Sequence, residues 1–140
     1  MIRLWLVLLL VPGLAHATDR LTGPVPAEVL RVIDGDTVEV EAQIWLGQSL
    51  RTLVRILGAD TPELHGKCAR ERDLAIQART FVAERLAGAV QLRDIGRDKY
   101  GGRVTARVIA ADGKDITDTL LGAGLAHPYG GGAKAGWCAG

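Results

Sequence analysis

Five short runs of apolar and β-branched residues, each bounded by turn-forming residues, restrict the possible folds of this chain more than any other feature. In residues 103–110, apolar Val104 and Ala106 alternate with polar Thr105 and Arg107. Alternation with a period of two places one set on the core face of a strand and the other on the solvent face. The other four runs are residues 28–33, 37–44, 50–57 and 90–95. This arrangement is typical of a small closed β-sheet.

Two helices are expected to pack on this sheet. Within residues 68–86 the apolar positions follow a helical spacing, and Gly88 ends the pattern. A shorter helix is expected over residues 116–123, before Gly124. With 140 residues the chain is long enough for one domain of modest core. We therefore predict a single domain of the α+β class.

The N-terminus has the pattern of a secretory signal. Arg3 precedes an apolar run over residues 4–11, and a small-x-small cleavage pattern ends at Ala17. The run is too short for a membrane anchor, which needs about 20 apolar residues; a buried core helix is the alternative reading. We expect residues 1–17 to be removed and the domain formed by residues 18–140 to be secreted or periplasmic, without a stable membrane anchor.

Export changes the interpretation of the two cysteines, Cys68 and Cys138. Thiols in a periplasmic or extracellular space tend to be oxidised, so we expect one disulfide between them. The bond would close a loop of about 70 residues and stabilise the fold by up to about 4 kcal/mol. It would also tie down the glycine-rich C-terminal segment. Two free thiols, or pairing between molecules, are the alternatives.

The charge balance directs attention to local sites. Seventeen Lys and Arg against sixteen Asp and Glu give a formal charge of +1, which excludes nucleic-acid binding by bulk charge alone. Arg55 lies within the apolar run of residues 53–57. A guanidinium group there is costly unless an anion pairs with it. A bidentate contact to phosphate is one interpretation, and a structural ion pair is the other.

Two short acidic segments follow the ends of expected strands. Asp34 and Asp36 flank a glycine at one strand junction, and Asp60 and Glu63 follow the third strand. Hard cations such as calcium take several oxygen ligands, which two such loops can supply if they meet at one rim of a barrel. Each segment also has an ordinary reading, as a turn or as the opening of a helix.

Three separated motifs then resemble the staphylococcal nuclease (thermonuclease) family. They are Val-Ile-Asp-Gly-Asp-Thr-Val at 32–38, Arg-Ile-Leu-Gly-Ala-Asp-Thr-Pro-Glu at 55–63 and Asp-Lys-Tyr-Gly at 98–101, within a similarity that runs from about residue 28 to 127. The resemblance implies a five-stranded OB-type β-barrel with two or three packed helices. It also implies a Ca²⁺-dependent endonuclease, a phosphodiesterase that hydrolyses DNA and RNA on the 5′-oxygen side and leaves 3′-phosphates.

The resemblance also implies roles for individual residues. Asp36 and Asp60 match the positions that give carboxylate oxygens to calcium, and Thr61 the position that gives its backbone carbonyl. Glu63 matches the general base that activates or orients the attacking water. Arg55 matches the residue that holds the phosphate and its developing charge.

The third motif contains a departure from the family pattern. Lys99 and Tyr100 match substrate-contacting positions, but Gly102 occupies the place of a second catalytic arginine, and Arg103 follows it. A shift of one residue in a strand turns a side chain to the opposite face. Glycine readily adopts unusual dihedrals and can absorb such a shift. We expect Arg103 to be the second phosphate ligand, with Arg97 as the alternative.

Two functions therefore compete. The first is an exported, monomeric, calcium-dependent endonuclease that acts on single-stranded or unstacked DNA and RNA. The second is a noncatalytic OB-type module of the cell envelope that binds nucleic acid or another polyanion. The aromatic content of 4% argues against the second, because single-strand binding modules depend on aromatic stacking platforms.

Overall fold

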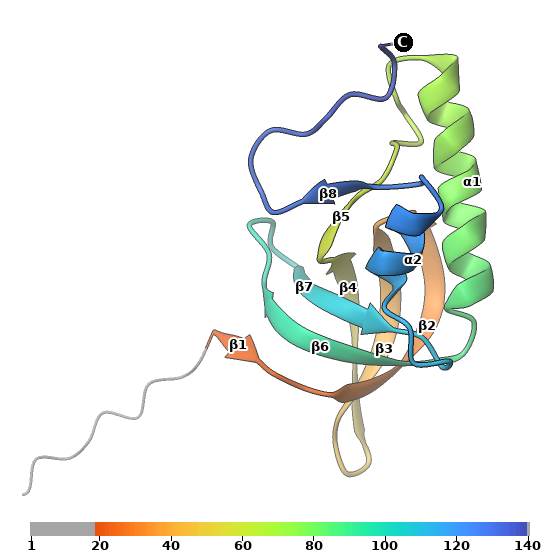
Figure 1. Ribbon diagram of the computed structural model, residues 1–140. Helices are drawn as coiled ribbons and strands as arrows, with labels where there is room; N and C mark the ends of the chain where they lie inside the picture. Colours follow the sequence, from red (N-terminus) through yellow and green to blue (C-terminus); the bar gives the residue numbers. More distant parts are fainter. Residues whose placement is uncertain (1–18, 140) are drawn as a thin grey trace, which may run out of the picture.

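The computed structural model describes residues 19–139, so the predicted signal segment, residues 1–17, lies outside the described part of the chain. None of the helices described there is long and apolar enough to span a membrane. The strands and helices are β1 (Arg20–Leu21), β2 (Val25–Asp34), β3 (Thr37–Trp45), β4 (Gln48–Ile56), β5 (Gly58–Asp60), α1 (Ala69–Arg85), β6 (Ala89–Arg97), β7 (Arg103–Ile109), α2 (Ile116–Gly122) and β8 (His127–Tyr129) (Figure 1).

Five of the strands close into a barrel. Strands β2, β3 and β4 form an antiparallel meander, and β6 pairs antiparallel with both β2 and β7. The parallel pairing of β4 with β7 completes the circle. Each of the five strands therefore pairs with a neighbour on both sides over at least part of its length. The expected OB-type barrel of the α+β class, with two packed helices, is confirmed.

The inward faces of the barrel strands form one hydrophobic core. In β7, Ala106 and Val108 are fully buried whereas Arg107 is exposed, as the period-two pattern predicts. The core residues are Ala27, Val38, Val40, Ala42, Val54, Ile56, Ala59, Val82, Leu86, Val90, Leu92, Ala106, Val108, Ile116, Leu120 and Ala126. The predicted alternation therefore identifies the core face correctly.

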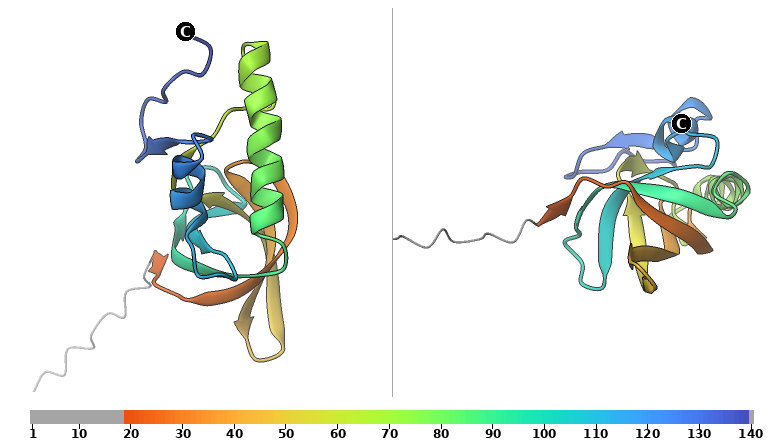
Figure 2. Two further views of the ribbon diagram at one scale, coloured as in Figure 1. Left: turned by 45° about the vertical axis from the view of Figure 1, so that its right-hand side comes forward. Right: turned by 90° about the horizontal axis from the view of Figure 1, so that it is seen from below.

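Helix α1 lies along one side of the barrel (Figure 2). Its buried face carries Ala75, Ala78 and Val82, whose small side chains let the helix approach the barrel closely. The expected disulfide between Cys68 and Cys138 is confirmed, with the two Cα atoms 5.9 Å apart. It joins the residue before α1 to the C-terminal end of the chain.

The short strands β1, β5 and β8 were not expected from the sequence. Strands β5 and β8 pair antiparallel as a separate two-stranded sheet, with Asp60 opposite His127 and Gly58 opposite Tyr129. Segments of three residues are too short to show a period, so their pairing depends on contacts between distant parts of the chain. This small sheet places the C-terminal segment beside the residues that follow β4.

Gly35, in the turn between β2 and β3, lies where three segments meet. A Cβ atom at this position would stand 2.8 Å from Cβ of Ala78 in α1 and 2.8 Å from Cβ and Oγ1 of Thr61. Contacts this short require the backbone to move. Only glycine lets the turn fit between α1 and the segment after β5.

We predict that Gly35→Ala lowers the free energy of unfolding by about 1–3 kcal/mol, because an added methyl group overpacks this junction. Urea denaturation measures the change. Gly122→Ala is the matched control, since a Cβ there has open space. An equal loss of stability in both variants would contradict the close-packing explanation.

Candidate active site

The two acidic segments expected at one rim of the barrel are brought together by the fold. The backbone N–H of Thr61 donates to Asp36 Oδ2 at 3.1 Å. Asp36, Asp60 and Thr61 are 8%, 3% and 2% exposed, so this junction is almost closed to solvent. Such burial of two carboxylates requires compensating positive charge.

Arg55 supplies part of that charge. Its Nη2 lies 3.2 Å from Asp36 Oδ2 and 3.9 Å from Asp60 Oδ1. Its Nη1 donates to the carbonyls of Ile56 and Ala59, both at 2.8 Å. The guanidinium group thus forms the structural ion pair considered above and also holds the turn between β4 and β5. Among the described residues the buried Nη2 has no partner with hydrogen-bond geometry, so its contact with the two carboxylates is one of charge.

Asp34 adds a third carboxyl group to this rim. Its Oδ1 accepts a hydrogen bond from the Asp36 N–H at 3.1 Å. Burial of the carboxyl group, and then the negative charge of Asp36, raise the pKa of Asp34 to about 6. A cation bound nearby would lower this pKa again and favour the ionised form of Asp34.

Lys134, from the C-terminal segment, completes a charge cluster that also contains Asp36, Arg55 and Asp60. Its Nζ lies 3.0 Å from Asp60 Oδ1 and 3.5 Å from Glu63 Oε1. Partial burial lowers the pKa of Lys134, but the hydrogen bond and negative charge of Asp60 outweigh this effect and raise it overall. The sequence does not single out Lys134, because it stands in a glycine-rich stretch without periodicity.

Glu63 is held by its backbone while its side chain stays in solvent. The Glu63 side chain is 63% exposed, and its N–H donates to Oε1 of Glu71 at 3.4 Å. The other carboxylate oxygen of Glu71 accepts from the Lys67 N–H at 3.0 Å. Glu71 is buried in the first turn of α1 and so fixes the loop that carries Glu63. The helical pattern alone gives this residue no special role.

Cys68, Cys138 and Glu71 also lie close enough together to suggest a metal site. Both sulfur atoms belong to the disulfide, so neither is available as a thiolate ligand. The oxygen-rich rim around Asp36 and Asp60 is the better candidate for a cation.

Two adjoining hollows open beside the charge cluster. One, of about 410 Å³, is lined by Asp34, Asp36 and Glu63 among others, and the second, of about 330 Å³, is lined by Lys99 and Tyr129 among others. Both hollows share the side chains of Arg55, Tyr100, Arg103 and Lys134. These two hollows bring the predicted phosphate and substrate residues together with Asp36 and Glu63. Asp60 lines a third hollow, of about 480 Å³, together with Thr61, Glu63 and Lys134.

Arg103 reaches the first two hollows despite the additional glycine before it. Gly102 lies in the turn before β7 with φ of 80°, a left-handed conformation that glycine adopts without strain. Arg103 Nε pairs with the Asp98 carboxylate, and its guanidinium carbon lies 4.7 Å from the centre of the Tyr100 ring. The alternative, Arg97, is highly exposed and pairs with Asp19.

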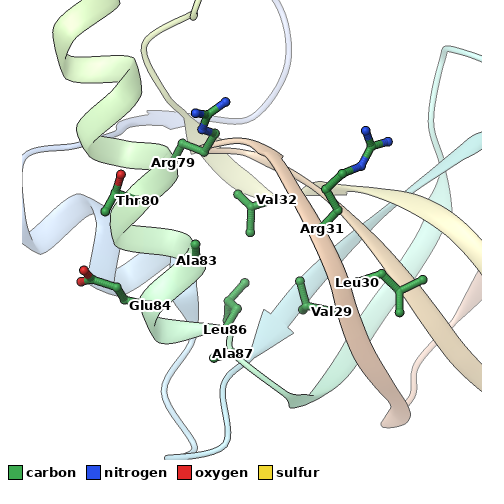
Figure 3. A pocket seen from close by; sticks show the side chains of 10 residues that line it. All are labelled: Val29, Leu30, Arg31, Val32, Arg79, Thr80, Ala83, Glu84, Leu86 and Ala87. Carbon is green, nitrogen blue, oxygen red and sulfur yellow. The ribbon is translucent and has the colours of Figure 1, made fainter.

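A different hollow, of about 510 Å³, lies between α1 and β2 (Figure 3). Its apolar floor includes Val29 and Val32, with Arg31 and Arg79 on opposite sides. Glu84 is the single carboxylate among its lining residues. One carboxylate cannot supply the set of oxygen ligands that Asp34, Asp36 and Glu63 offer at the barrel rim.

Comparison with known proteins identifies a family for this chain. The model of the family described as staphylococcal nuclease homologue matches residues 53–134, more than half of the chain. The chain therefore belongs to the staphylococcal nuclease family.

Two curated relatives carry the description "Uncharacterized endonuclease", one from Escherichia coli and one from Escherichia coli O157:H7. Each is 28% identical to this chain over 110 residues, a match that covers 78% of this chain and 64% of the relative. The chain thus matches less than two thirds of the length of these relatives.

The raised pKa of Asp34 predicts a pH-dependent stability. The folded protein binds this proton more tightly than the unfolded chain, so the stabilisation is complete below about pH 4 and is lost as the pH rises through about 6. In calcium-free buffer we expect Asp34→Asn to increase the free energy of unfolding by about 1–3 kcal/mol at pH 7. Below about pH 4 the gain should vanish. Urea denaturation of both proteins between about pH 4 and 7 measures this difference. A gain in the free energy of unfolding that is equal at every pH would refute the raised pKa of Asp34.

Proposed function

We propose that this protein is an exported, calcium-dependent endonuclease that hydrolyses phosphodiester bonds of DNA and RNA. The observation that carries the proposal is the placement of Arg55 Nη2 within 3.2 Å of Asp36 and 3.9 Å of Asp60, beside hollows that Arg103 also lines. One rim thereby combines oxygen ligands for a cation with guanidinium groups for a phosphate. Family membership supports the nuclease class, and the secretory pattern of residues 1–17 supports export.

The residues of the rim fit a hard divalent cation. Asp36 and Asp60 offer carboxylate oxygens, and Thr61 offers its backbone carbonyl, all of which suit calcium. The buried Thr61 Oγ1 has no hydrogen-bond partner within residues 19–139, so the junction contains an oxygen atom that could still bind a cation or a water molecule. A bound calcium ion would polarise a phosphoryl oxygen and offset the charge that develops during hydrolysis.

The protein residues would divide the remaining work. The Glu63 carboxylate, exposed next to the cluster, would orient a water molecule and accept its proton as the oxygen attacks phosphorus. The guanidinium groups of Arg55 and Arg103 would bind phosphate oxygens as they gain negative charge. The bond between phosphorus and the 5′ oxygen would then break, and the departing oxygen would take a proton from solvent, so that the products are a 3′-phosphate and a 5′-hydroxyl.

The neighbouring hollow suits a flexible strand. Lys99, Tyr100 and Tyr129 line it, and Tyr100 is exposed. Exposed aromatic rings stack on bases of any sequence, and a lysine attracts the backbone. We therefore propose single-stranded or unstacked DNA and RNA as substrates for a monomer that cuts without base-specific recognition.

We predict that the purified protein digests DNA in calcium, that a calcium chelator stops digestion, and that Glu63→Gln lowers the rate at least about a hundredfold. Circular dichroism should show that the variant is folded. Glu84→Gln removes the same charge from the exposed face of α1 and should keep the normal rate. Full activity of Glu63→Gln would remove Glu63 from the mechanism, whereas binding without digestion by the unmodified protein would favour the noncatalytic module.

Arg103→Ala should lower kcat/KM about a hundredfold or more, as expected for loss of a donor to the reacting phosphate. The matched control, Arg97→Ala, should change it less than about threefold, because Arg97 lines neither hollow of the site. Steady-state kinetics on single-stranded DNA compares the two. The reverse ranking would show that Arg97 is the second phosphate ligand.

A further inference from the structure

Residues 130–139 form a strap beside the site, which we call the C-terminal strap. Before it, Tyr129 pairs with Gly58 in the small sheet, and the Tyr129 hydroxyl donates to the Gly132 carbonyl at 3.2 Å. Near its other end the disulfide between Cys68 and Cys138 fixes it to the start of α1. The strap is thus restrained at both ends although it contains little regular structure.

A second contact supports the anchor near the disulfide. The ring of Trp137 stacks on that of His127 in β8, with centres 3.8 Å apart and planes 11° from parallel. Stacking of this kind adds to the burial of apolar area. The strap is therefore held at its end by a covalent bond and by an aromatic contact, with Lys134 between the two restrained ends.

The Lys134 ammonium occupies part of the space that a cation held by Asp60 would need. Nζ lies 3.0 Å from Asp60 Oδ1, whereas a calcium ion lies about 2.3–2.6 Å from its oxygen ligands. An ammonium ion and a divalent cation on the same carboxylate repel each other strongly. A cation held by Asp60 Oδ1 would therefore compete with the Lys134 ammonium for that oxygen.

We propose that Lys134 is a tethered counter-ion of the metal site, which neutralises Asp60 and Glu63 until a divalent cation displaces it. The inference rests on the proposed function, because it takes the acidic rim as the calcium site. The Lys134 side chain is 43% exposed and also lines the adjoining hollow, so it has space into which it can move. Displacement costs free energy, so the site fills only at a higher calcium concentration than the same carboxylates would need alone.

The disulfide makes this counter-ion effective. A lysine on a free chain end would pair with exposed carboxylates only weakly, since ordering the segment costs conformational entropy. With Cys138 fixed to Cys68, the ammonium remains at high local concentration near the rim. Reduction of the disulfide should therefore weaken the competition with calcium.

Calorimetric titration of calcium into the calcium-free protein tests the proposal without an activity assay. We expect Lys134→Met to bind calcium about tenfold more tightly than the unmodified protein. Lys114→Met, which removes the same charge from the exposed turn between β7 and α2, should bind as the unmodified protein does. Unchanged or weaker binding by Lys134→Met would overturn the counter-ion role and leave the proposed function intact. Absence of calcium binding in all three proteins would overturn both.

A double-mutant cycle tests the tether. In the Cys68→Ser, Cys138→Ser background, Lys134→Met should change calcium affinity by less than about twofold, because the strap no longer holds the ammonium at the rim. Circular dichroism establishes whether this background is folded. If it is not, calcium affinity is measured instead on the protein with its cysteines intact, while dithiothreitol reduces the disulfide stepwise. A tenfold effect of Lys134→Met in the untethered protein would show that the disulfide does not position this lysine.

Discussion

The burial of Asp36 and Asp60 around the Arg55 guanidinium group is the interaction on which the arrangement of the site depends. Each carboxylate would be costly in isolation, and each comes from a different segment of the chain. Arg55 compensates both and also donates to carbonyls of the turn between β4 and β5. The charge cluster therefore holds the two acidic segments together. Its carboxylates have more oxygen atoms than Arg55 contacts, and the remaining oxygens suit a cation.

The barrel and α1 determine where this cluster forms. Strand β4 carries Arg55, the turn between β2 and β3 carries Asp36, and their antiparallel pairing through β3 brings them into register. Gly35 lets that turn approach α1. From the same helix, Glu71 holds the backbone of Glu63. Core packing and site geometry thus share one set of contacts, so a change in either should affect the other.

The C-terminal strap gives the site a feature that the barrel alone does not provide. A disulfide and an aromatic stack hold it near the rim, and Lys134 lies among carboxylates proposed to bind calcium. The proposed export would keep this bond oxidised, because periplasmic and extracellular compartments are oxidising. The proposed competition between a lysine and a metal ion would then depend on an intact disulfide.

The sequence by itself determined the five barrel strands and the two helices, because period-two and helical patterns record which face of each element is buried. It predicted the cysteine pairing from the secretory pattern, with free thiols or pairing between molecules left open until the structure showed the bond. The motifs also identified Asp36, Arg55 and Asp60 as candidates, although their roles remain predictions. Only the tertiary structure decided the β5–β8 pairing and the contacts of Lys134 and Glu71 with the site. Those contacts join residues far apart in the chain, and no local periodicity encodes them.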